Sequence, residues 1–516
     1  MDSNCFSRRQ FLAASAAAIG ARLTAGANQA QVARNKSGRT NIIIFMPDQL
    51  RAESIGCYGH TLIRTPNIDR LASEGTRFSH CQAQYPVCTA SRCSMLTGWP
   101  PHVRGHRTVY HLLCPDEPNM FRYLKRNGYD VYWYGKNDAL VHEKFDQSAT
   151  AWGFFADGPE WSGKDNPWPQ DDPHYYSFLF NEGRDRRDYP DYARVKAAIK
   201  ILETRNSDSP FCIFLPLFFP HPPFAGPKDF HNMYDPNKIP PLRPGGLEGK
   251  PDFYQAIHQS RRLDQLTEAD FRKINAVYLG MISYTDWLLG ELLEAVDRTN
   301  HNNDTTIIFC SDHGEWAGDY GLVEKWSAAM DDAVLHVPLI VRTPGGVRGH
   351  VSREMVELYD VMATCLELAG IEAQHTHFAR SLVSQINGGP GDPDRAAFSE
   401  GGYNVNEPHC FEPLELFEPD HIYYPKIHLE NTQPRMITRT TMIRTGDWKL
   451  VMRPDGQGEL YDLVKDPREL HNVYRDKTYA RRREALAARL LDWYIRTSDV
   501  VPKGYDPRGL PKFPLG

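Results

Sequence analysis

The sequence predicts an α/β protein in which a large mixed, mostly parallel β-sheet is flanked by helices and followed by a smaller C-terminal α+β subdomain. Short apolar runs alternate with helical patterns, which is typical of a sheet covered by helices on both faces. Four of these runs end in a polar side chain. A Gly/Pro-rich stretch at 387–393 then marks a boundary. The length of 516 residues also exceeds one ordinary core.

The predicted strands are short, apolar and rich in β-branched residues. The first, Asn41–Met46, ends at Pro47-Asp48 and is apolar enough to be buried on both faces. The same pattern recurs at 129–134 before Gly135-Lys136, at 211–219 before Pro220-His221, and at 305–310 before Ser311-Asp312-His313. Ligands of such sheets bind outside the carboxyl ends of the strands, so we expect these polar residues to converge on one site.

Helical patterns lie between the apolar runs, and glycines close several of them. They cover Pro66–Glu74, 119–127, 193–205, 266–299 and 357–369, and a shorter one opens at 93–98. The segment 152–190 is polar, aromatic and irregular, and a loop of that length is usually functional or disordered.

The boundary at 387–393 divides the chain into two expected parts. We expect a catalytic domain over 40–385 and a C-terminal subdomain over 394–516. The second part contains strand-like runs at 436–441 and 448–452 and a basic helix at 480–496. The triple arginine 481–483 on this helix is interpreted as a solvated face.

The first 27 residues differ in composition from the rest. Arg8-Arg9 precedes Phe11-Leu12, an Ala-rich apolar run and a small-residue cleavage site. This order predicts a twin-arginine signal peptide over 1–27, which makes the export machinery a partner. The protein would then be an exported bacterial protein, periplasmic or extracellular. An N-terminal amphipathic helix is the alternative, and no transmembrane span is expected elsewhere.

The charge balance excludes a general affinity for nucleic acid. Lys and Arg total 59 against 65 Asp and Glu, a formal net charge of −6, so an anionic ligand must be captured locally. The ten cysteines form no C-x-x-C pair, which excludes a zinc module and a disulfide scaffold, although an oxidising compartment permits one or two bridges.

Several common catalytic motifs are missing. G-x-S-x-G, H-E-x-x-H and G-x-G-x-x-G do not occur. The phosphate-loop spacing at 158–164 is followed by Asp165 instead of a magnesium-binding hydroxyl, and no strand precedes it, which indicates a surface turn.

The sequence Cys88-Thr-Ala-Ser-Arg92 stands at the start of a predicted helix, where backbone N–H groups stabilise a nucleophile or a bound anion. Alone, this pattern fits a buried inert cysteine equally well. Asp48, Asp312 and His313 add two carboxylates and one imidazole, a set suited to Ca²⁺ or Mg²⁺ rather than zinc. Singly they fit a helix cap or a structural histidine, but together at one sheet edge they predict a metal site.

From about residue 41 to 473 the chain resembles the sulfatase family of the alkaline phosphatase superfamily. Cys88 to Arg92, continued by Leu96-Thr-Gly98 and Pro101-His102, resembles the family's modification sequence. Further similar segments are Gly128-Tyr129 with Gly135-Lys136, Pro220-His-Pro-Pro-Phe224, Ser311-Asp-His-Gly-Glu315, Gly321-Leu322 to Lys325, and Glu459-Leu-Tyr-Asp-Leu463 with Asp466-Pro467. The resemblance implies an alkaline phosphatase-like fold.

The resemblance also implies a sulfuric ester hydrolase. Its cysteine would be oxidised to formylglycine by a dedicated maturase and would attack sulfur in a two-step covalent scheme. The implied metal ligands are Asp48, Gln49, Cys88, Asp312 and His313, with Ca²⁺ as the metal and Mg²⁺ as the alternative. The implied catalytic residues are Cys88, Arg92, Lys136, His221 and Lys325, of which Lys136, His221 and Lys325 also bind substrate. Arg92 would hold the nucleophile in position, and His221 would bind the bridging oxygen and protonate the leaving alcohol.

Three positions depart from the family pattern. Gln49 stands where a second aspartate is common, and Ala90 replaces the commoner proline, which favours a maturase of the radical-SAM type. Asp138 replaces the histidine of the second signature. Asp138 and His142 are the candidates to handle the proton of the formylglycine diol.

Aromatic residues narrow the class of substrates that the sequence favours. Trp152, Trp161 and Trp168 either form platforms for sugar rings or belong to the local core. With export they favour a sulfated oligo- or polysaccharide, and the stretch 401–409 is a weaker candidate for substrate contact. The alternatives are a phosphonate monoester or phosphodiester hydrolase of the same superfamily, and a non-catalytic sulfated-glycan binder with unconverted Cys88.

Overall fold

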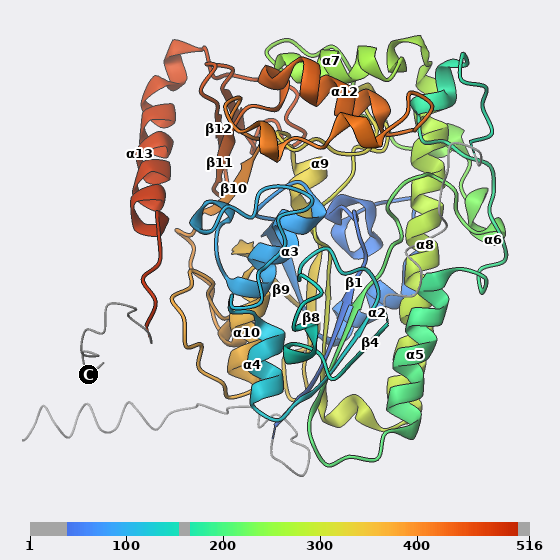
Figure 1. The fold of residues 1–516 in the computed structure, drawn as a ribbon, viewed down its shortest axis with the longest axis vertical. Coiled ribbons are helices and arrows are strands. Elements are labelled where there is room, and N and C mark those ends of the chain that lie inside the picture. The colour runs from blue at the N-terminus through green and yellow to red at the C-terminus, as the bar shows by residue number, and fades with distance from the viewer. Residues whose placement is uncertain (1–38, 154–165, 504–516) are drawn as a thin grey trace, which may run out of the picture.

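The computed structural model describes residues 39–153 and 166–503 (Figure 1). The signal segment 1–27, the turn at 158–164 and Trp161 lie outside these residues. Within the described ranges, no helix is long and apolar enough to cross a membrane.

A nine-stranded sheet forms the centre of the molecule. Its strands run in the order β4-β3-β5-β1-β6-β8-β2-β7, with β9 paired to β2. Their bounds are β1 Asn41–Met46, β2 Thr76–Gln82, β3 Asp130–Tyr134, β4 Ala151–Gly153, β5 Phe211–Pro216, β6 Thr305–Cys310, β7 His336–Val337, β8 Leu339–Arg342 and β9 His350–Glu357. The first five strands of this order are parallel, whereas β8 is antiparallel to both β6 and β2. The predicted mixed, mostly parallel sheet is therefore confirmed.

Helices cover both faces of the sheet, with α3, α4 and α10 on one side of the strands and α5 and α8 on the other (Figure 1). Their bounds are α2 Pro66–Glu74, α3 Cys88–Thr97, α4 Met120–Arg126, α5 Pro190–Thr204, α6 Lys228–His231, α7 Asp252–Ser260, α8 Glu268–Arg298, α9 Asp332–Leu335, α10 Asp360–Leu368 and α11 Val383–Ile386. The long α8 begins with a capping box, in which the Thr267 side chain accepts from the backbone of Asp270 and the Asp270 carboxylate accepts from Thr267. This cap defines the first turn of the longest helix.

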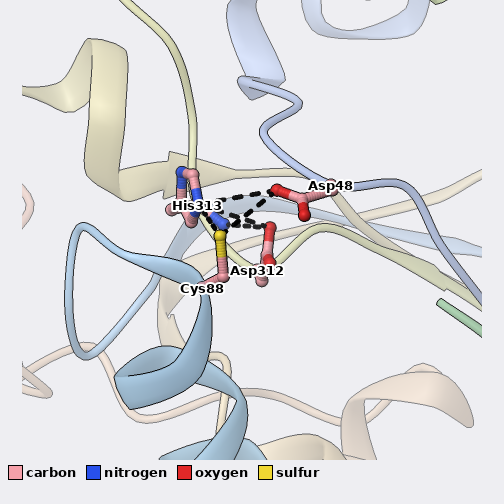
Figure 2. A group of neighbouring side chains, drawn as sticks. All are labelled: Asp48, Cys88, Asp312 and His313. Atoms are coloured by element: carbon pink, nitrogen blue, oxygen red, sulfur yellow. Dashed lines mark hydrogen bonds and ion pairs between the residues drawn. The ribbon is translucent and has the colours of Figure 1, made fainter. Parts of the chain in front are cut away.

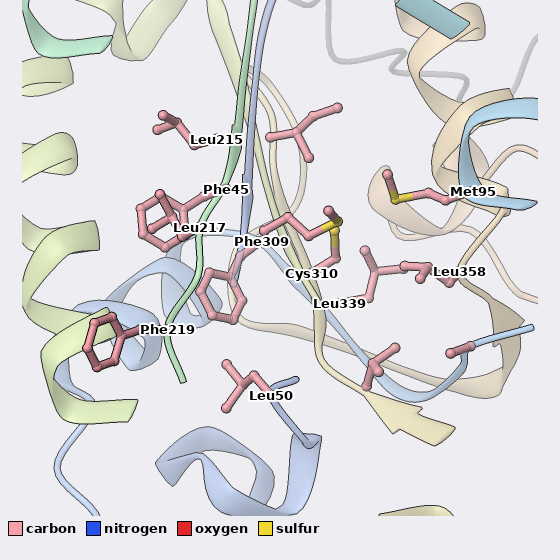
Figure 3. Close-up of a cluster of buried hydrophobic side chains, with 14 of the residues drawn as sticks. Phe45, Leu50, Met95, Leu215, Leu217, Phe219, Phe309, Cys310, Leu339 and Leu358 are labelled. Atoms are coloured by element: carbon pink, nitrogen blue, oxygen red, sulfur yellow. The ribbon is translucent and has the colours of Figure 1, made fainter. Parts of the chain in front are cut away.

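The central strands are buried because helices cover both of their faces. Every residue of β1 and β6 is buried. Phe45 stacks on Phe309 with ring centroids 5.9 Å apart, and both lie among the aliphatic side chains drawn in Figure 3. This apolar centre holds the carboxyl ends of the strands at fixed positions.

A second, four-stranded antiparallel sheet follows in the C-terminal region. It consists of β10 Ala397–Gly401, β11 Thr440–Arg444, β12 Trp448–Met452 and β13 Glu459–Asp462, accompanied by α12 Tyr424–Thr432 and α13 Ala480–Thr497. Ile443, Leu450 and Leu460 of this sheet pack against Leu490 and Trp493 of α13. The predicted small α+β unit is present.

Buried ion pairs join the two sheets. The Lys449 ammonium on β12 lies 2.5 Å from Asp332 at the start of α9 and also pairs with Glu469. Lys449 and Glu469 are fully buried. A buried charge is tolerated only when its partners are in place, so these contacts fix how the second sheet sits on the first.

Some elements differ from the sequence prediction. Strands β2, β8 and β9 were not predicted. Charged and polar residues such as Arg77 and Arg353 interrupt the apolar pattern of β2 and β9, whereas β8 is a short apolar run of four residues. Residue 357 ends β9, so the helix expected from that point begins only at Asp360. In the C-terminal region, a 3₁₀ turn over Pro434–Ile437 occupies the first residues of the strand expected at 436–441, so the observed strand β11 begins only at Thr440.

Candidate active site

Four neighbouring parallel strands deliver the predicted polar residues to one edge of the sheet. In spatial order, β3 leads to Lys136, β5 to His221, β1 to Asp48, and β6 to Asp312 and His313. Because β3, β5, β1 and β6 are adjacent, the loops that follow them meet. The convergence expected from the sequence is what the fold produces.

Asp48, Cys88, Asp312 and His313 form a buried cluster at this edge (Figure 2). One ligand atom from each lies within 4.8 Å of all the others. The ring Nδ1 of His313 contacts the Gly314 carbonyl at 2.9 Å, which assigns the proton to Nδ1 and leaves the Nε2 lone pair facing the cluster. Burial lowers the pKa of His313, consistent with the neutral form that binds metals. Two carboxylates and a neutral imidazole fit a divalent cation.

Gln49 lies beside this cluster in a backbone conformation that is unusual for a residue with a side chain, with φ of 68°. Its side-chain oxygen accepts a hydrogen bond from Lys325 at 2.6 Å, and its amide nitrogen donates to Glu315. The Gln49 backbone N–H donates to the Asp312 carboxylate at 3.1 Å. The amide is thus oriented by a cation on one side and a carboxylate on the other.

Cys88 is the first residue of α3, directly after the extended residue Val87. Its sulfur lies 3.1 Å from Nε2 of His313 and 3.6 Å from Nζ of Lys136. Burial, followed by the nearby Asp48 carboxylate, raises the pKa of the Cys88 thiol to about 12. A thiol with that pKa is protonated at neutral pH and is therefore a weak nucleophile unless it is chemically converted.

Arg92 lies one helical turn after Cys88 and is almost fully buried. Its guanidinium donates to Asp312 at 2.8 Å and to Asp48 at 3.1 Å. Burial by itself lowers the pKa of Arg92, but the two carboxylates outweigh it and raise the pKa above its ordinary value. Arg92 thereby ties the nucleophile helix to the carboxylates of the cluster and stays a cation.

Lys136 sits between two carboxylates. Its Nζ lies 2.7 Å from Asp48 and 2.8 Å from Asp138. Burial alone lowers the pKa of Lys136, but Asp138 and Asp48 outweigh it and hold the pKa well above its ordinary value. Of the two candidates to replace the missing family histidine, Asp138 contacts Lys136 directly, whereas His142 is exposed.

His221 and Lys325 form the opposite side of the site. His221 Nδ1 lies 2.6 Å from the Pro222 carbonyl, so this nitrogen carries the proton, and Nε2 faces Lys325 Nζ at 3.1 Å. Burial, followed by the Lys325 charge, lowers the pKa of His221 well below its usual value. The imidazole is therefore neutral, and its Nε2 accepts a hydrogen bond from Lys325.

The aromatic candidates of the irregular segment serve mainly local packing. The Trp168 indole donates to the Leu179 carbonyl at 2.7 Å and stacks on His174. Trp152 is 42% exposed and packs on Phe145. Of the two candidate tryptophans that the structure describes, only Trp152 keeps a large exposed face.

The stretch 401–409 lies near the nucleophile helix. The Gly402 carbonyl accepts from the Tyr85 hydroxyl, and Tyr85 packs with Val87 and Ala90 on either side of Cys88. Arg107 and Glu407 form a bidentate pair between the loop after α3 and this stretch. The two loops therefore form part of the surroundings of the Cys88 end of α3.

Other sequence signals have structural roles. His102 contacts Glu400 on β10 at 3.0 Å and the Thr497 carbonyl of α13 at 2.8 Å, so it links the two sheets. Arg482 lies over the Trp448 ring on the exposed side of α13, as expected for a solvated face. The nine cysteines of the described ranges are all free thiols, so none forms a bridge there.

Sequence reasoning did not assign roles to Glu315 and Glu324, which border the site. Glu315 accepts from Gln49, and its carboxylate also accepts from the backbone of Ala317 and Glu324. Glu324 pairs with Lys325 at 2.9 Å. Glu315 lies two residues after His313, and Glu324 directly precedes Lys325. This proximity to predicted site residues was the signal available in the sequence.

Comparison with known proteins gives consistent matches along the chain. The family model described as Sulfatase matches residues 40–371, and the one described as N-sulphoglucosamine sulphohydrolase, C-terminal, matches residues 415–495. Arylsulfatase K of Mus musculus is 26% identical over 454 residues, covering 84% of this chain and 76% of that protein. Iduronate 2-sulfatase of Homo sapiens is 29% identical over 391 residues, covering 66% of this chain and 70% of that protein.

Solved structures share the fold. A phosphonate monoester hydrolase of Agrobacterium radiobacter superposes with a TM-score of 0.71 at 23% identity, covering 89% of this chain and 96% of that chain. A protein in complex with its substrate D-glucosamine-2-N,6-O-disulfate superposes with a TM-score of 0.70 at 21% identity, covering 89% and 98%. At these identities the likeness concerns the architecture.

Proposed function

The chain belongs to the sulfatase family, and we propose that it hydrolyses sulfate esters of a sulfated oligo- or polysaccharide, using Cys88 converted to formylglycine and a bound divalent cation. The observation that carries this proposal is the Cys88 sulfur at the start of α3, beside two carboxylates and a neutral imidazole. Burial raises the pKa of the Cys88 thiol to about 12, so the unmodified group is a weak nucleophile at neutral pH.

The nucleophile and the cation supply the basic chemistry. The hydrated formylglycine provides an oxygen nucleophile at the position of the Cys88 sulfur. A divalent cation held by Asp48, Gln49, Asp312 and His313, together with the modified residue, supplies Lewis-acid polarisation of the sulfate oxygens. We propose Ca²⁺, since the donors are mostly hard oxygens, with Mg²⁺ as the alternative.

The remaining side chains bind and orient the substrate. Lys136 and Lys325 lie on either side of the cluster and place positive charge where the sulfate group gains negative charge. Arg92 holds the two carboxylates and the nucleophile helix in register. His221, which faces Lys325, is placed to meet the bridging oxygen, and in its protonated form it would protonate the leaving alcohol.

A saccharide substrate is supported by the relatives. The matched proteins include an iduronate 2-sulfatase and a protein solved with a disulfated glucosamine. We also propose the domain limits 40–385 and 394–516, a twin-arginine signal over 1–27, export to the periplasm or beyond, and oxidation of Cys88 by a maturase. The Arg8-Arg9 pair and the Cys88 motif support the last three.

Mass spectrometry of the proteolytic peptide that contains Cys88 tests the proposal. In active protein from its natural host, we expect formylglycine at this position. An active preparation with only the unmodified thiol would contradict the mechanism.

A second test separates the competing activities and the metal. We expect Asp312→Ala to lose Ca²⁺ binding, measured by calorimetry, together with turnover of an aryl sulfate. Full activity in the presence of a chelator would contradict the metal site. Faster turnover of an aryl phosphodiester than of the aryl sulfate would favour the phosphodiesterase alternative, and saccharide affinity without sulfate release would favour the non-catalytic binder.

A further inference from the structure

Lys325 is held by three different groups. Its Nζ lies 2.6 Å from the Gln49 side-chain oxygen, 3.1 Å from His221 Nε2 and 2.9 Å from the Glu324 carboxylate. The contacts with Gln49 and His221 are hydrogen bonds, whereas the contact with Glu324 is an ion pair without hydrogen-bond geometry. Two of these partners belong to the site, and Glu324 is the one that carries a negative charge.

The contact between Glu324 and Lys325 requires a special backbone. Neighbouring side chains in an extended chain point to opposite sides, so they do not normally meet. Glu324 has φ of 71°, in the left-handed region that is costly for a residue with a side chain. Its N–H donates to Glu315 at 2.6 Å, and its carbonyl accepts from Trp316. The loop after β6 therefore holds Glu324 in this conformation.

Two further cations surround the Glu324 carboxylate. Arg261, which follows α7 and is buried, lies 3.9 Å from it and covers the Phe178 ring. Lys426 of α12 is buried and paired with Glu412 at 2.9 Å. Burial alone raises the pKa of Glu324, but Lys325, Lys426 and Arg261 outweigh it and lower the pKa below its ordinary value. The group is thus a carboxylate held between the site lysine and two cations of other elements.

We propose that Glu324 is a positioning residue, which holds the Lys325 ammonium against Gln49 and His221 so that it meets the sulfate group. This inference rests on the proposed function, because it takes Lys325 to be a sulfate-binding group. Without Glu324, a lysine among Lys136, Arg92 and a metal cation would be repelled from the site.

A double-mutant cycle tests whether Glu324 acts through Lys325. We expect Glu324→Gln to lower kcat by about 10- to 100-fold on an aryl sulfate with a smaller change in KM. In the Lys325→Met background, we expect the same substitution to change kcat by less than about twofold. Glu324→Asp, which keeps the charge, should recover part of the loss. Additive losses in the cycle would overturn the proposal.

A matched control variant tests whether the loss of any buried carboxylate lowers kcat in the same way. Glu469 is another buried glutamate paired with a lysine, Lys449, outside the site. Glu469→Gln should keep the wild-type kcat once the protein is shown to be folded by near-ultraviolet circular dichroism. An equal loss of kcat in this variant would show that any buried charge change has the effect and would overturn the proposal.

A binding measurement separates this inference from the proposed function. Inorganic sulfate is titrated into the same four proteins in a Cys88→Ser background, where no turnover is needed. We expect Glu324→Gln to weaken sulfate binding when Lys325 is present and not when it is Met. If this coupling is found but the wild type hydrolyses no sulfate ester, the proposed function fails and the positioning role stands. If the coupling is absent, the positioning role fails.

Discussion

Asp138 stands where sulfatases usually have a histidine, and it forms an ion pair with Lys136 at 2.8 Å. It also has φ of 29°, an uncommon value that the surrounding loop must support. Burial alone raises the pKa of Asp138, but Lys136 and Arg92 outweigh it and lower the pKa below its ordinary value. The side chain is therefore an unprotonated carboxylate in the neutral range, and we propose it as the group that handles the proton of the formylglycine diol.

This assignment predicts a change in the pH profile. Asp138→Asn should lower kcat by about 10- to 100-fold, because an amide cannot accept the proton. Asp138→His should retain activity at high pH but lose it below about pH 6.5, because a histidine accepts a proton only above its pKa. The wild-type protein, in which the pKa of Asp138 is lowered, should lose no activity near pH 6.5 through protonation of this carboxylate. The pH–rate profiles of the wild type and of these variants test the prediction. A larger loss of kcat for His142→Ala than for Asp138→Asn would contradict the role of Asp138.

At the scale of single elements, the turn after β3 determines where Lys136 lies. Gly135 has φ of 144°, and a Cβ there would lie 2.1 Å from the Pro216 carbonyl of β5. That same carbonyl accepts from the Lys136 backbone N–H at 2.8 Å. The close approach of two strands therefore requires a glycine directly before the site lysine.

Gly135→Ala tests this requirement. We expect a loss of about 2–4 kcal/mol in the free energy of unfolding, because the two backbones must separate, together with a loss of activity as Lys136 moves. Gly446→Ala is the matched control, since a Cβ there meets nothing within 4 Å, and it should change stability by less than about 0.5 kcal/mol. Denaturant unfolding followed by circular dichroism measures both, and equal stabilities would refute the argument.

The elements that sequence reasoning predicted well are those with strong local signals. Asn41–Met46 and Thr305–Cys310 are buried throughout and mostly apolar because helices cover both faces, and Pro66–Glu74 begins with a proline and is followed by a glycine. Strands β2 and β9 were missed because polar and charged residues interrupt their apolar pattern, and the pairing of the two strands supplies the order that this pattern lacks.

The contacts of the active site also divide into those that the sequence predicted and those that it did not. Asp48, Lys136, Asp312 and His313 could be placed from sequence, since each directly follows a predicted parallel strand. The contacts of Gln49 with Glu315 and of Lys325 with Glu324 could not, because they depend on left-handed backbone at Gln49 and Glu324. Local sequence patterns predict where a strand ends but not how the following loop turns.

At the scale of the whole molecule, buried charges join the two sheets. Lys449 of β12 in the second sheet is fully buried. It pairs with Asp332 at the start of α9 and with Glu469, which follows β13. Replacing a buried ion partner leaves the other charge uncompensated, which is far more costly than the loss of an exposed pair. The stability of the assembled molecule should therefore depend on this lysine.

Lys449→Met is expected to lower the free energy of unfolding by about 3–5 kcal/mol. Lys465→Met is the matched control: Lys465 pairs with Asp462 at 3.0 Å but is largely exposed, so its loss should leave the free energy of unfolding nearly unchanged. Urea unfolding of both variants measures the difference. Equal losses would show that burial of the Lys449 pair has no part in holding the sheets together.

The burial of α3 has a consequence for the order of events in the life of the protein. All ten residues from Cys88 to Thr97 are buried, and the Cys88 side of the helix faces the closed cluster. A maturase that binds this segment as a peptide cannot reach it once the chain has folded. The proposed oxidation of Cys88 would therefore have to come first, before α3 is buried, and a molecule that folded with the unmodified thiol would stay inactive.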